Sequence, residues 1–197
     1  MVIPARTVLF LGYDPDETRL IDFLESQGCN VDHTKNRVTV DQVCRYDLVL
    51  SFGYRHILKP DILDAVKRPV INLHIALLPW NRGAHPNFWA FHDETPHGVT
   101  LHHIDEGVDT GDIVAQRRLE FSDLTLTLRQ TQERLLAEIE DLFMENWFRI
   151  GDRSYDARPQ AGAGSVHKVA DLPAFEGGWD RRICDVLEEV RGNYENE

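Results

Sequence analysis

Asn72 and His74 are the first residues in this chain whose types and spacing could support catalysis. They lie at the end of a short β-prone run, residues 70–74, and residues i and i+2 of a strand point to the same face. An amide and an imidazole side by side can donate hydrogen bonds to a developing oxyanion, and the imidazole can also carry a proton. An Asn-x-His pair is a weak signal alone, because a strand-end histidine often only bonds to a neighbouring loop. The surrounding residues must therefore decide between these two interpretations.

The pair is followed by an irregular loop that is rich in aromatic and polar side chains. Its candidate binding residues are Trp80, Asn81, Arg82, His85, Asn87 and Trp89. Such loops on a rigid sheet are often binding sites, although an edge loop that packs its tryptophans on the core is the alternative. Residues 55–92 carry five basic and two acidic side chains, which makes a local charge of +3 in a chain of net charge −12. This local charge favours a small anionic ligand, such as one that bears phosphates.

A third segment, residues 104–112, is rich in aspartate and glycine. Counted from Asp105, Gly107 stands at the third loop position, where a calcium-binding EF-hand needs an oxygen ligand, so we exclude a calcium site. The nearby residues His97, His102 and His103 could suggest a metal, but adjacent strand residues face opposite ways. We interpret these three histidines as ordinary polar residues of the core or surface.

In this order, the segments resemble the formyltransferases that use N10-formyltetrahydrofolate. The motifs that carry the resemblance are Asn72-x-His74, Leu77-Leu-Pro79, Arg82-Gly-Ala84 and Asp105-x-Gly-x-Asp-Thr-Gly111. The segments 51–57, 81–91 and 160–168 look most like the sugar nucleotide N-formyltransferases of the dTDP-amino-sugar type. The resemblance covers about residues 45–172.

The resemblance implies a catalytic trio of Asn72, His74 and Asp109, with Asn72 and protonated His74 as oxyanion donors and Asp109 as the partner of His74. It also implies that the folate co-substrate lies, largely through backbone groups, against Arg55, His56, Ile57, Leu58, Ile104, Asp105, Glu106, Gly107 and Val108. A nucleotide-linked amino sugar would meet the six loop residues named above, and no metal is required. The predicted function is formyl transfer from N10-formyltetrahydrofolate to this sugar, as a precursor of a surface glycan.

Two alternatives remain open. A glycinamide ribonucleotide formyltransferase matches in length, but it binds phosphate on a Gly/Ser-rich turn after the first strand, where a helix N-terminus favours anions. This chain has three acidic residues in that turn, residues 12–17, and they would repel a phosphate. A non-catalytic folate or nucleotide-sugar binder of the same fold is the second alternative, although a binder would need none of the trio.

The elements that must position these residues alternate between strands and helices, which predicts βαβ units. We expect strands at 7–12, 30–34, 47–52, 70–74, 99–104 and 113–121, and helices at 16–27, 60–66, 87–92 and 125–150. The predicted fold class is α/β, a Rossmann-like domain with a mostly parallel sheet flanked by helices. Residues 1–150 would form the catalytic domain, and residues 151–197 a short C-terminal covering segment.

Composition limits the partners and the compartment. A chain of 197 residues with 33 acidic and 21 basic side chains is a poor candidate for binding nucleic acid. Three scattered cysteines, no signal peptide and no apolar run of about 20 residues predict a cytoplasmic protein without membrane insertion. A homodimer is possible, and nothing in the sequence decides it.

Overall fold

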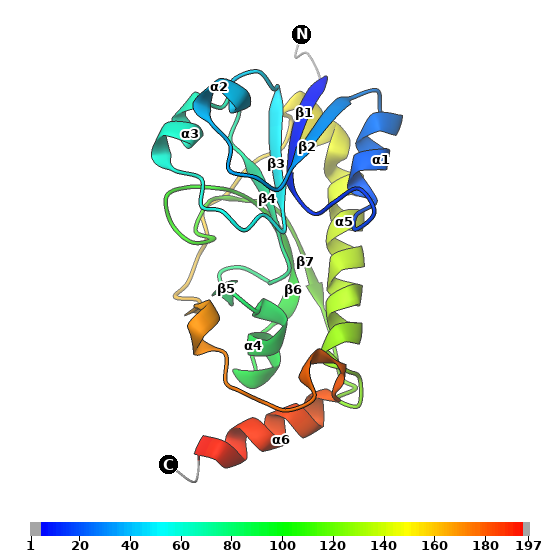
Figure 1. The fold of residues 1–197 in the computed structure, drawn as a ribbon, viewed down its shortest axis with the longest axis vertical. Coiled ribbons are helices and arrows are strands. Elements are labelled where there is room, and N and C mark those ends of the chain that lie inside the picture. The colour runs from blue at the N-terminus through cyan, green and yellow to red at the C-terminus, as the bar shows by residue number, and fades with distance from the viewer. Residues whose placement is uncertain (1–4, 195–197) are drawn as a thin grey trace.

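The computed structural model describes residues 5–194, and six strands form its central sheet in the order β2-β1-β3-β4-β6-β7 (Figure 1). The strands are β1 (Thr7–Gly12), β2 (Asn30–Thr34), β3 (Leu48–Phe52), β4 (Ile71–His74), β6 (His97–His103) and β7 (Ile113–Leu119). Strands β1 to β4 are parallel, whereas β6 runs antiparallel to both β4 and β7. The predicted α/β fold with a mostly parallel sheet is thus confirmed.

Helices cover both faces of this sheet (Figure 1). The helices of residues 5–194 are α1 (Leu20–Ser26), α2 (Val40–Val43), α3 (Pro60–Ala65), α4 (Pro86–His92), α5 (Leu128–Asp152) and α6 (Ile183–Tyr194). Side chains of α1 and α5 pack in one core with one face of β1, β3, β4 and β6, while α2 and α3 pack in a second core with the opposite face. Because both faces are covered, β1 and β3 are apolar along most of their length instead of alternating.

The long helix α5 begins at Leu128, three residues later than the apolar pattern predicts. The reason is a capping box: the Thr127 hydroxyl accepts a hydrogen bond from the Gln130 N–H, and the Gln130 side-chain oxygen accepts one from the Thr127 N–H. The helix ends where Arg153 takes a left-handed conformation, with φ of 62°.

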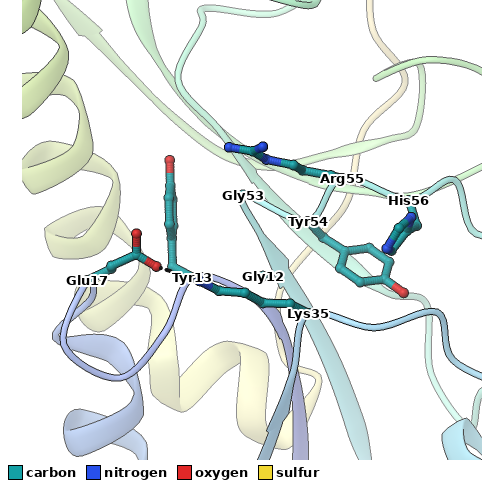
Figure 2. A pocket seen from close by; sticks show the side chains of 8 residues that line it. All are labelled: Gly12, Tyr13, Glu17, Lys35, Gly53, Tyr54, Arg55 and His56. Carbon is teal, nitrogen blue, oxygen red and sulfur yellow. Dashed lines mark hydrogen bonds and ion pairs between the residues drawn. The ribbon is translucent and has the colours of Figure 1, made fainter.

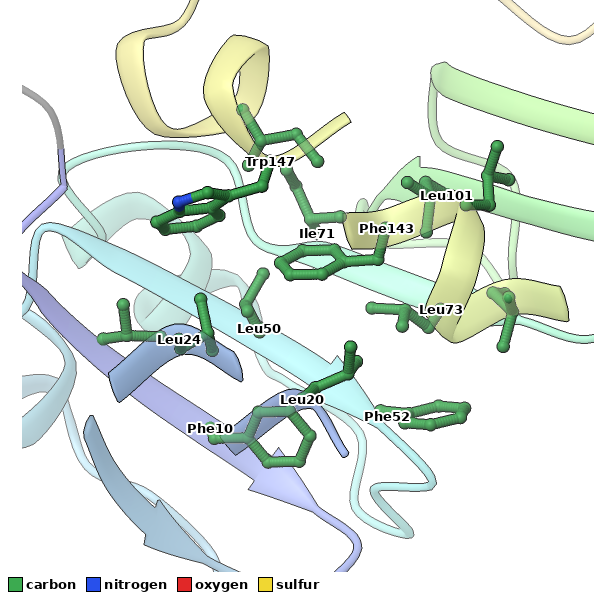
Figure 3. Packing of buried hydrophobic residues seen from close by; sticks show 14 of the residues in the cluster. Phe10, Leu20, Leu24, Leu50, Phe52, Ile71, Leu73, Leu101, Phe143 and Trp147 are labelled. Carbon is green, nitrogen blue, oxygen red and sulfur yellow. The ribbon is translucent and has the colours of Figure 1, made fainter. Parts of the chain in front are cut away.

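The main core lies between the sheet and helix α5 (Figure 3). Phe10, Leu50, Ile71, Leu101 and Phe143 are fully buried there. Truncating an aromatic side chain in such a core typically costs about 3–5 kcal/mol of folding free energy. This packing gives the C-terminal end of β4 a rigid base.

The chain returns across the sheet edge after α5. Arg158 first bridges to Ile113, and the two-residue strand β8 (Val166–His167) then pairs in parallel with β5 (Arg82–Gly83). Two 3-10 turns follow, at Val169–Asp171 and Gly178–Asp180, before α6 packs against α4. The sequence analysis predicts neither the β5–β8 pair nor α2, because two-residue strands and one-turn helices leave no periodic pattern. It also misses the 12-residue helix α6, which lies in the predicted covering segment 151–197. No helix within residues 5–194 is long and apolar enough to cross a membrane.

His97, the first residue of β6, is a histidine held among aromatic rings. Its ring centroid lies 4.2 Å from that of Phe91 and 5.2 Å from that of Phe121, and its buried Nε2 has no hydrogen-bond partner among the described residues. Burial lowers the pKa of His97 from 6.5 to about 4.

The substitution His97→Phe is expected to make folding less sensitive to acid. Below pH 6.5 the unfolded chain protonates His97 while the folded chain does not until about pH 4, so the wild type loses stability as pH falls through this window. The loss of unfolding free energy between pH 7 and 4.5 should be smaller in the variant by about 2 kcal/mol. Urea unfolding of both proteins at the two pH values measures this difference, and equal losses would contradict the assignment.

Candidate active site

The predicted trio meets at the C-terminal end of β4. Along this strand Ile71 and Leu73 point into the main core, so Asn72 and His74 share the opposite face. Asp109 comes from the loop after β6 and faces both side chains. Its carboxylate lies 3.6 Å from Nδ1 of His74 and 3.5 Å from Nδ2 of Asn72. An amide, an imidazole and a carboxylate are thus within reach of one reacting centre.

Asp109 is held in its ionised form. Burial alone would raise its pKa, but the neighbouring imidazoles of His74 and His102, with a 2.8 Å hydrogen bond from the Gly83 N–H, hold the pKa well below its usual range. Its backbone is left-handed, with φ of 51°, which is uncommon for a residue other than glycine. The carboxylate is therefore a fixed negative charge beside two imidazole rings.

His74 is 8% exposed, and its two ring nitrogens have different surroundings. Nε2 lies 3.0 Å from the backbone carbonyl of Asn81, and because a carbonyl only accepts, Nε2 carries a hydrogen. Nδ1 faces Asp109 and is the nitrogen that can exchange a proton. The loop that follows β4 thereby fixes the orientation of the imidazole.

His102 belongs to the same site, although the sequence analysis treats it as an ordinary polar residue. It is 1% exposed, and its Nδ1 lies 2.7 Å from the His103 carbonyl, so Nδ1 carries the hydrogen of the neutral ring. Nε2 then accepts a 3.1 Å hydrogen bond from Nδ2 of Asn72. The signal that could have found it is strand pairing, because β6 places His102 directly opposite Asn72. His103 faces the other way and bonds to Tyr155.

A cavity of about 250 Å³ opens beside the trio. It is lined by Asn72, Asp109 and His102, and by all nine residues of the predicted folate site: Arg55, His56, Ile57, Leu58, Ile104, Asp105, Glu106, Gly107 and Val108. Its lining combines charged and polar residues of two loops with apolar residues such as Ile57, which is 82% exposed. Such a mixture is typical of a small-molecule site.

A second cavity, of about 390 Å³, lies across the segment 54–56 from the first (Figure 2). Its other walls come from the turn after β1, from Lys35 and from Gly53. Arg55 extends its guanidinium toward the hydroxyl end of Tyr13 (Figure 2). Within residues 5–194 no carboxylate lies within ion-pair distance of this guanidinium, so Arg55 is available to an anion.

The acidic turn after β1 is already occupied by its own contacts. The Glu17 carboxylate accepts a 2.8 Å hydrogen bond from the Asp14 N–H, and Lys35 bonds to the carboxylates of both Asp14 and Glu17. The hydrogen bond from the Asp14 backbone, together with Lys35, lowers the pKa of Glu17. A backbone N–H that could face a phosphate here instead meets a carboxylate.

The six predicted sugar-binding residues divide into two groups. Asn81, Asn87 and Trp89 are buried: Asn81 bonds to Thr95 and Ser165, Asn87 to Leu128 and Thr131, and Trp89 stacks on His167 at 4.0 Å. These three side chains are engaged in internal packing, which leaves the predicted sugar contacts to the other three. Trp80 is 36% exposed, while Arg82 and His85 are partly exposed.

Gln160 also reaches the site from the segment after α5, and the sequence analysis noted it only as the start of a motif. Its side chain bonds to the backbone of Asp109 and to the guanidinium of Arg82. Only the tertiary fold brings residue 160 to this loop. Among the described residues, no group of three or more histidine, cysteine, aspartate or glutamate side chains is arranged to hold a metal ion.

Comparison with known proteins shows what the chain is similar to. The family described as Formyl transferase matches residues 24–146. The dTDP-4-amino-4,6-dideoxyglucose formyltransferase of Mycobacterium tuberculosis is 33% identical over 128 residues, which are 65% of this chain and 53% of that protein. The methionyl-tRNA formyltransferase of Pelotomaculum thermopropionicum is 31% identical over 146 residues, 74% of this chain and 46% of that protein. The chain thus spans about half the length of these curated relatives.

Among solved structures, the formyltransferase PseJ from Anoxybacillus kamchatkensis is similar over nearly its whole length. It is 39% identical, with a TM-score of 0.85, and the match covers 93% of this chain and 99% of that chain. That structure contains UDP-4,6-dideoxy-4-formamido-L-AltNAc and tetrahydrofolate.

Proposed function

Because the chain belongs to the formyl transferase family, as its motifs predict, we propose that it transfers a formyl group from N10-formyltetrahydrofolate to the amino group of a nucleotide-linked amino sugar. The observation that carries the proposal is the convergence of Asn72, His74 and Asp109 beside the 250 Å³ cavity, which Asn72 and Asp109 line. The similarity to PseJ, whose structure contains a formylated amino-sugar nucleotide and a folate, supports this choice of substrates.

The chemistry follows from the contacts of the trio. The neutral amine of the sugar attacks the formyl carbon, a new C–N bond forms, and the formyl oxygen becomes an oxyanion. Nδ2 of Asn72 bonds to His102 at 3.1 Å and to Asp109 at 3.5 Å, and the N–H of the longer bond can donate to this oxyanion instead. Because Nδ1 of His74 faces the same space, an imidazolium there adds a second donor.

Collapse of the tetrahedral species breaks the bond between the formyl carbon and N10. The attacking amine must lose one proton, and N10 must gain one. His74 can carry that proton on Nδ1, because Nε2 keeps its hydrogen for the Asn81 carbonyl. Asp109 stabilises the imidazolium that exists between the two transfers.

The two cavities suggest where the two substrates bind. We assign the folate to the 250 Å³ cavity, which is lined in part by Asn72 and Asp109. We assign the nucleotide sugar to Arg55 and the exposed residues of the 75–89 loop. In a protein of net charge −12, an arginine that faces a cavity without a carboxylate partner is suited to a diphosphate. The substrates would then meet at Asn72, His74 and Asp109.

The substitution Arg55→Ala is expected to raise KM for the nucleotide sugar about 10- to 150-fold, with kcat changed little. A lost charge-assisted hydrogen bond is worth about 1.5–3 kcal/mol, and contact with a distant phosphate is equal in the ground and transition states. Steady-state kinetics with each substrate varied in turn measures the change. Arg45→Ala removes an exposed arginine outside both cavities and should leave both KM values unaltered. A rise confined to KM for the folate would instead place Arg55 against the folate.

The glycinamide ribonucleotide alternative requires a phosphate in the turn after β1. Two acidic side chains and Lys35 already bond to one another there, which argues against this substrate. Location in the cytoplasm, assembly as a homodimer and production of a surface glycan precursor are further parts of our proposal.

A formyl-transfer assay over a panel of amino-sugar nucleotides tests the proposal. We expect a gain of one formyl group, detected by mass spectrometry, that depends on N10-formyltetrahydrofolate. Glycinamide ribonucleotide and methionyl-tRNA serve as the comparison substrates. Turnover of either one alone would overturn the proposed substrate class, and folate binding without turnover of any acceptor would favour the non-catalytic binder.

A further inference from the structure

Residues 158–167, here called the strap, cross from one active-site loop to the other. At one end, Arg158 and Ile113 exchange two backbone hydrogen bonds of 2.7 and 3.0 Å, just beyond the loop that carries Asp109. At the other end, the Ser165 carbonyl accepts a 3.0 Å hydrogen bond from the N–H of Arg82, and β8 pairs with β5. The strap lies outside the part of the chain that the family match covers, residues 24–146.

Gln160 lies in this strap and uses its whole amide. Nε2 donates to the backbone carbonyls of Asp109 at 2.8 Å and Gly111 at 2.9 Å. Oε1 accepts from Nε of Arg82 at 3.1 Å and from Nη2 at 2.8 Å. Two donors and two acceptor sites are all that a glutamine amide has. Glutamate would lack the donors and lysine the acceptors, so glutamine is matched to this position.

Asp109 needs such an anchor. Its left-handed backbone is unfavourable for a residue with a side chain, and Asp105 to Val108 before it are exposed to solvent or nearly so. Gln160 bonds to the main chain of Asp109, while the Gly83 N–H bonds to its carboxylate. Because Gly83 is itself paired with β8, the strap supports both the backbone and the side chain of Asp109.

We infer that Gln160 is a positioning residue for formyl transfer: it holds Asp109 at its distance from His74 and ties that loop to Arg82 of the sugar side. The inference rests on the proposed function and extends it to a residue that touches no reacting atom. A displacement of about 1 Å in a catalytic group can cost about 100-fold in rate, so the expected effect of losing this anchor is large.

The first test compares Gln160→Ala, Gln160→Asn and Gln160→Glu. We expect kcat to fall about 10- to 100-fold in Gln160→Ala. Gln160→Asn keeps the amide on a shorter side chain and should recover part of this loss. Gln160→Glu still accepts from Arg82 but turns a carboxylate toward two carbonyl oxygens, and it should be at least as slow as Gln160→Ala. Near-normal kcat in Gln160→Glu would overturn the inference.

The matched control is Arg158→Ala. It removes an exposed side chain from the same strap and leaves the backbone bridge to Ile113 intact, so its kcat should stay close to the wild-type value. Thermal melts of all four variants accompany the kinetics. Losses of kcat that follow the melting temperature alone, Arg158→Ala included, would assign the strap a structural role and overturn the inference.

A double-mutant cycle separates positioning from general weakening. If Gln160 acts through Asp109, then Gln160→Ala should lower the residual single-turnover rate of Asp109→Asn by less than about threefold. A multiplicative loss would overturn the inference. Wild-type turnover is measured first, because its absence on every acceptor would count against the proposed function. If the wild type is active and the Gln160 variants are unaffected, the positioning role of Gln160 is contradicted and the proposed function is not.

Discussion

The substitution His74→Ala should lower kcat at least 100- to 1000-fold, the loss typical of a single oxyanion donor. The loss should be larger than for Asn72→Ala, since His74 is both a donor and the carrier of the proton that moves from the amine to N10. KM for either substrate should change little, because the missing contacts strengthen mainly in the transition state. Single-turnover rates with saturating substrates measure the change.

Asn72→Ala provides the comparison for that result, with an expected loss of about 100- to 1000-fold in kcat. The two side chains act on one oxyanion, so the double variant should lose less than the product of the single losses. His102→Gln provides a control inside the same network, because a glutamine oxygen can still accept from the Asn72 amide. Full additivity, or near-normal turnover by the His74 variant, would mean that the trio is not the catalytic centre.

Asp109→Asn is expected to have the second large effect, a fall in kcat of about 100- to 10,000-fold, the range typical of general acid–base catalysis. The variant keeps the size of the side chain and the bond from Gly83 but removes the negative charge that faces His74 at 3.6 Å. An imidazolium is then less favourable, so the loss relative to wild type should grow as pH rises. A pH profile of kcat for both proteins measures this, and a loss that is the same at every pH would contradict the role.

The pKa of Asp109 adds a second readout. Despite burial, His74 and His102 hold this pKa well below its usual range, so the carboxylate contributes stability above about pH 4 that is lost as the pH falls further. As the pH falls below about 4, the wild type should therefore lose more unfolding free energy than Asp109→Asn. In the working range of the enzyme Asp109 stays ionised, and its titration should not appear in the activity profile.

The sequence was sufficient to predict those features of the site that depend on residues close together in the chain. Alternation along one strand predicts that Asn72 and His74 share a face, and the structure has them so. The nine residues assigned to the folate come from two segments, each continuous in sequence, and they line one cavity. Both predictions depend only on residue types and their order within short continuous segments.

Residues whose roles depend on tertiary contacts could not be predicted from the sequence. His102 depends on the register between β4 and β6, and a single chain without strand pairing does not specify that register. Burial had a similar effect in the opposite direction: Asn81, Asn87 and Trp89 have side chains suited to sugar binding, but the fold turns them inward. Composition indicates which groups are available, and only packing decides which remain accessible.

The position of the strap late in the chain has a consequence during synthesis. Translation releases all six strands of the central sheet and both catalytic loops before residues 158–167 leave the ribosome. Until then the nascent chain can collapse around its sheet while the loop of Asp109 lacks the bonds from residue 160 and from β8. Folding of the core and maturation of the active site are therefore separate events in time. A premature stop after α5 would remove the strap and its bonds to the Asp109 loop. All six strands of the central sheet would still be made.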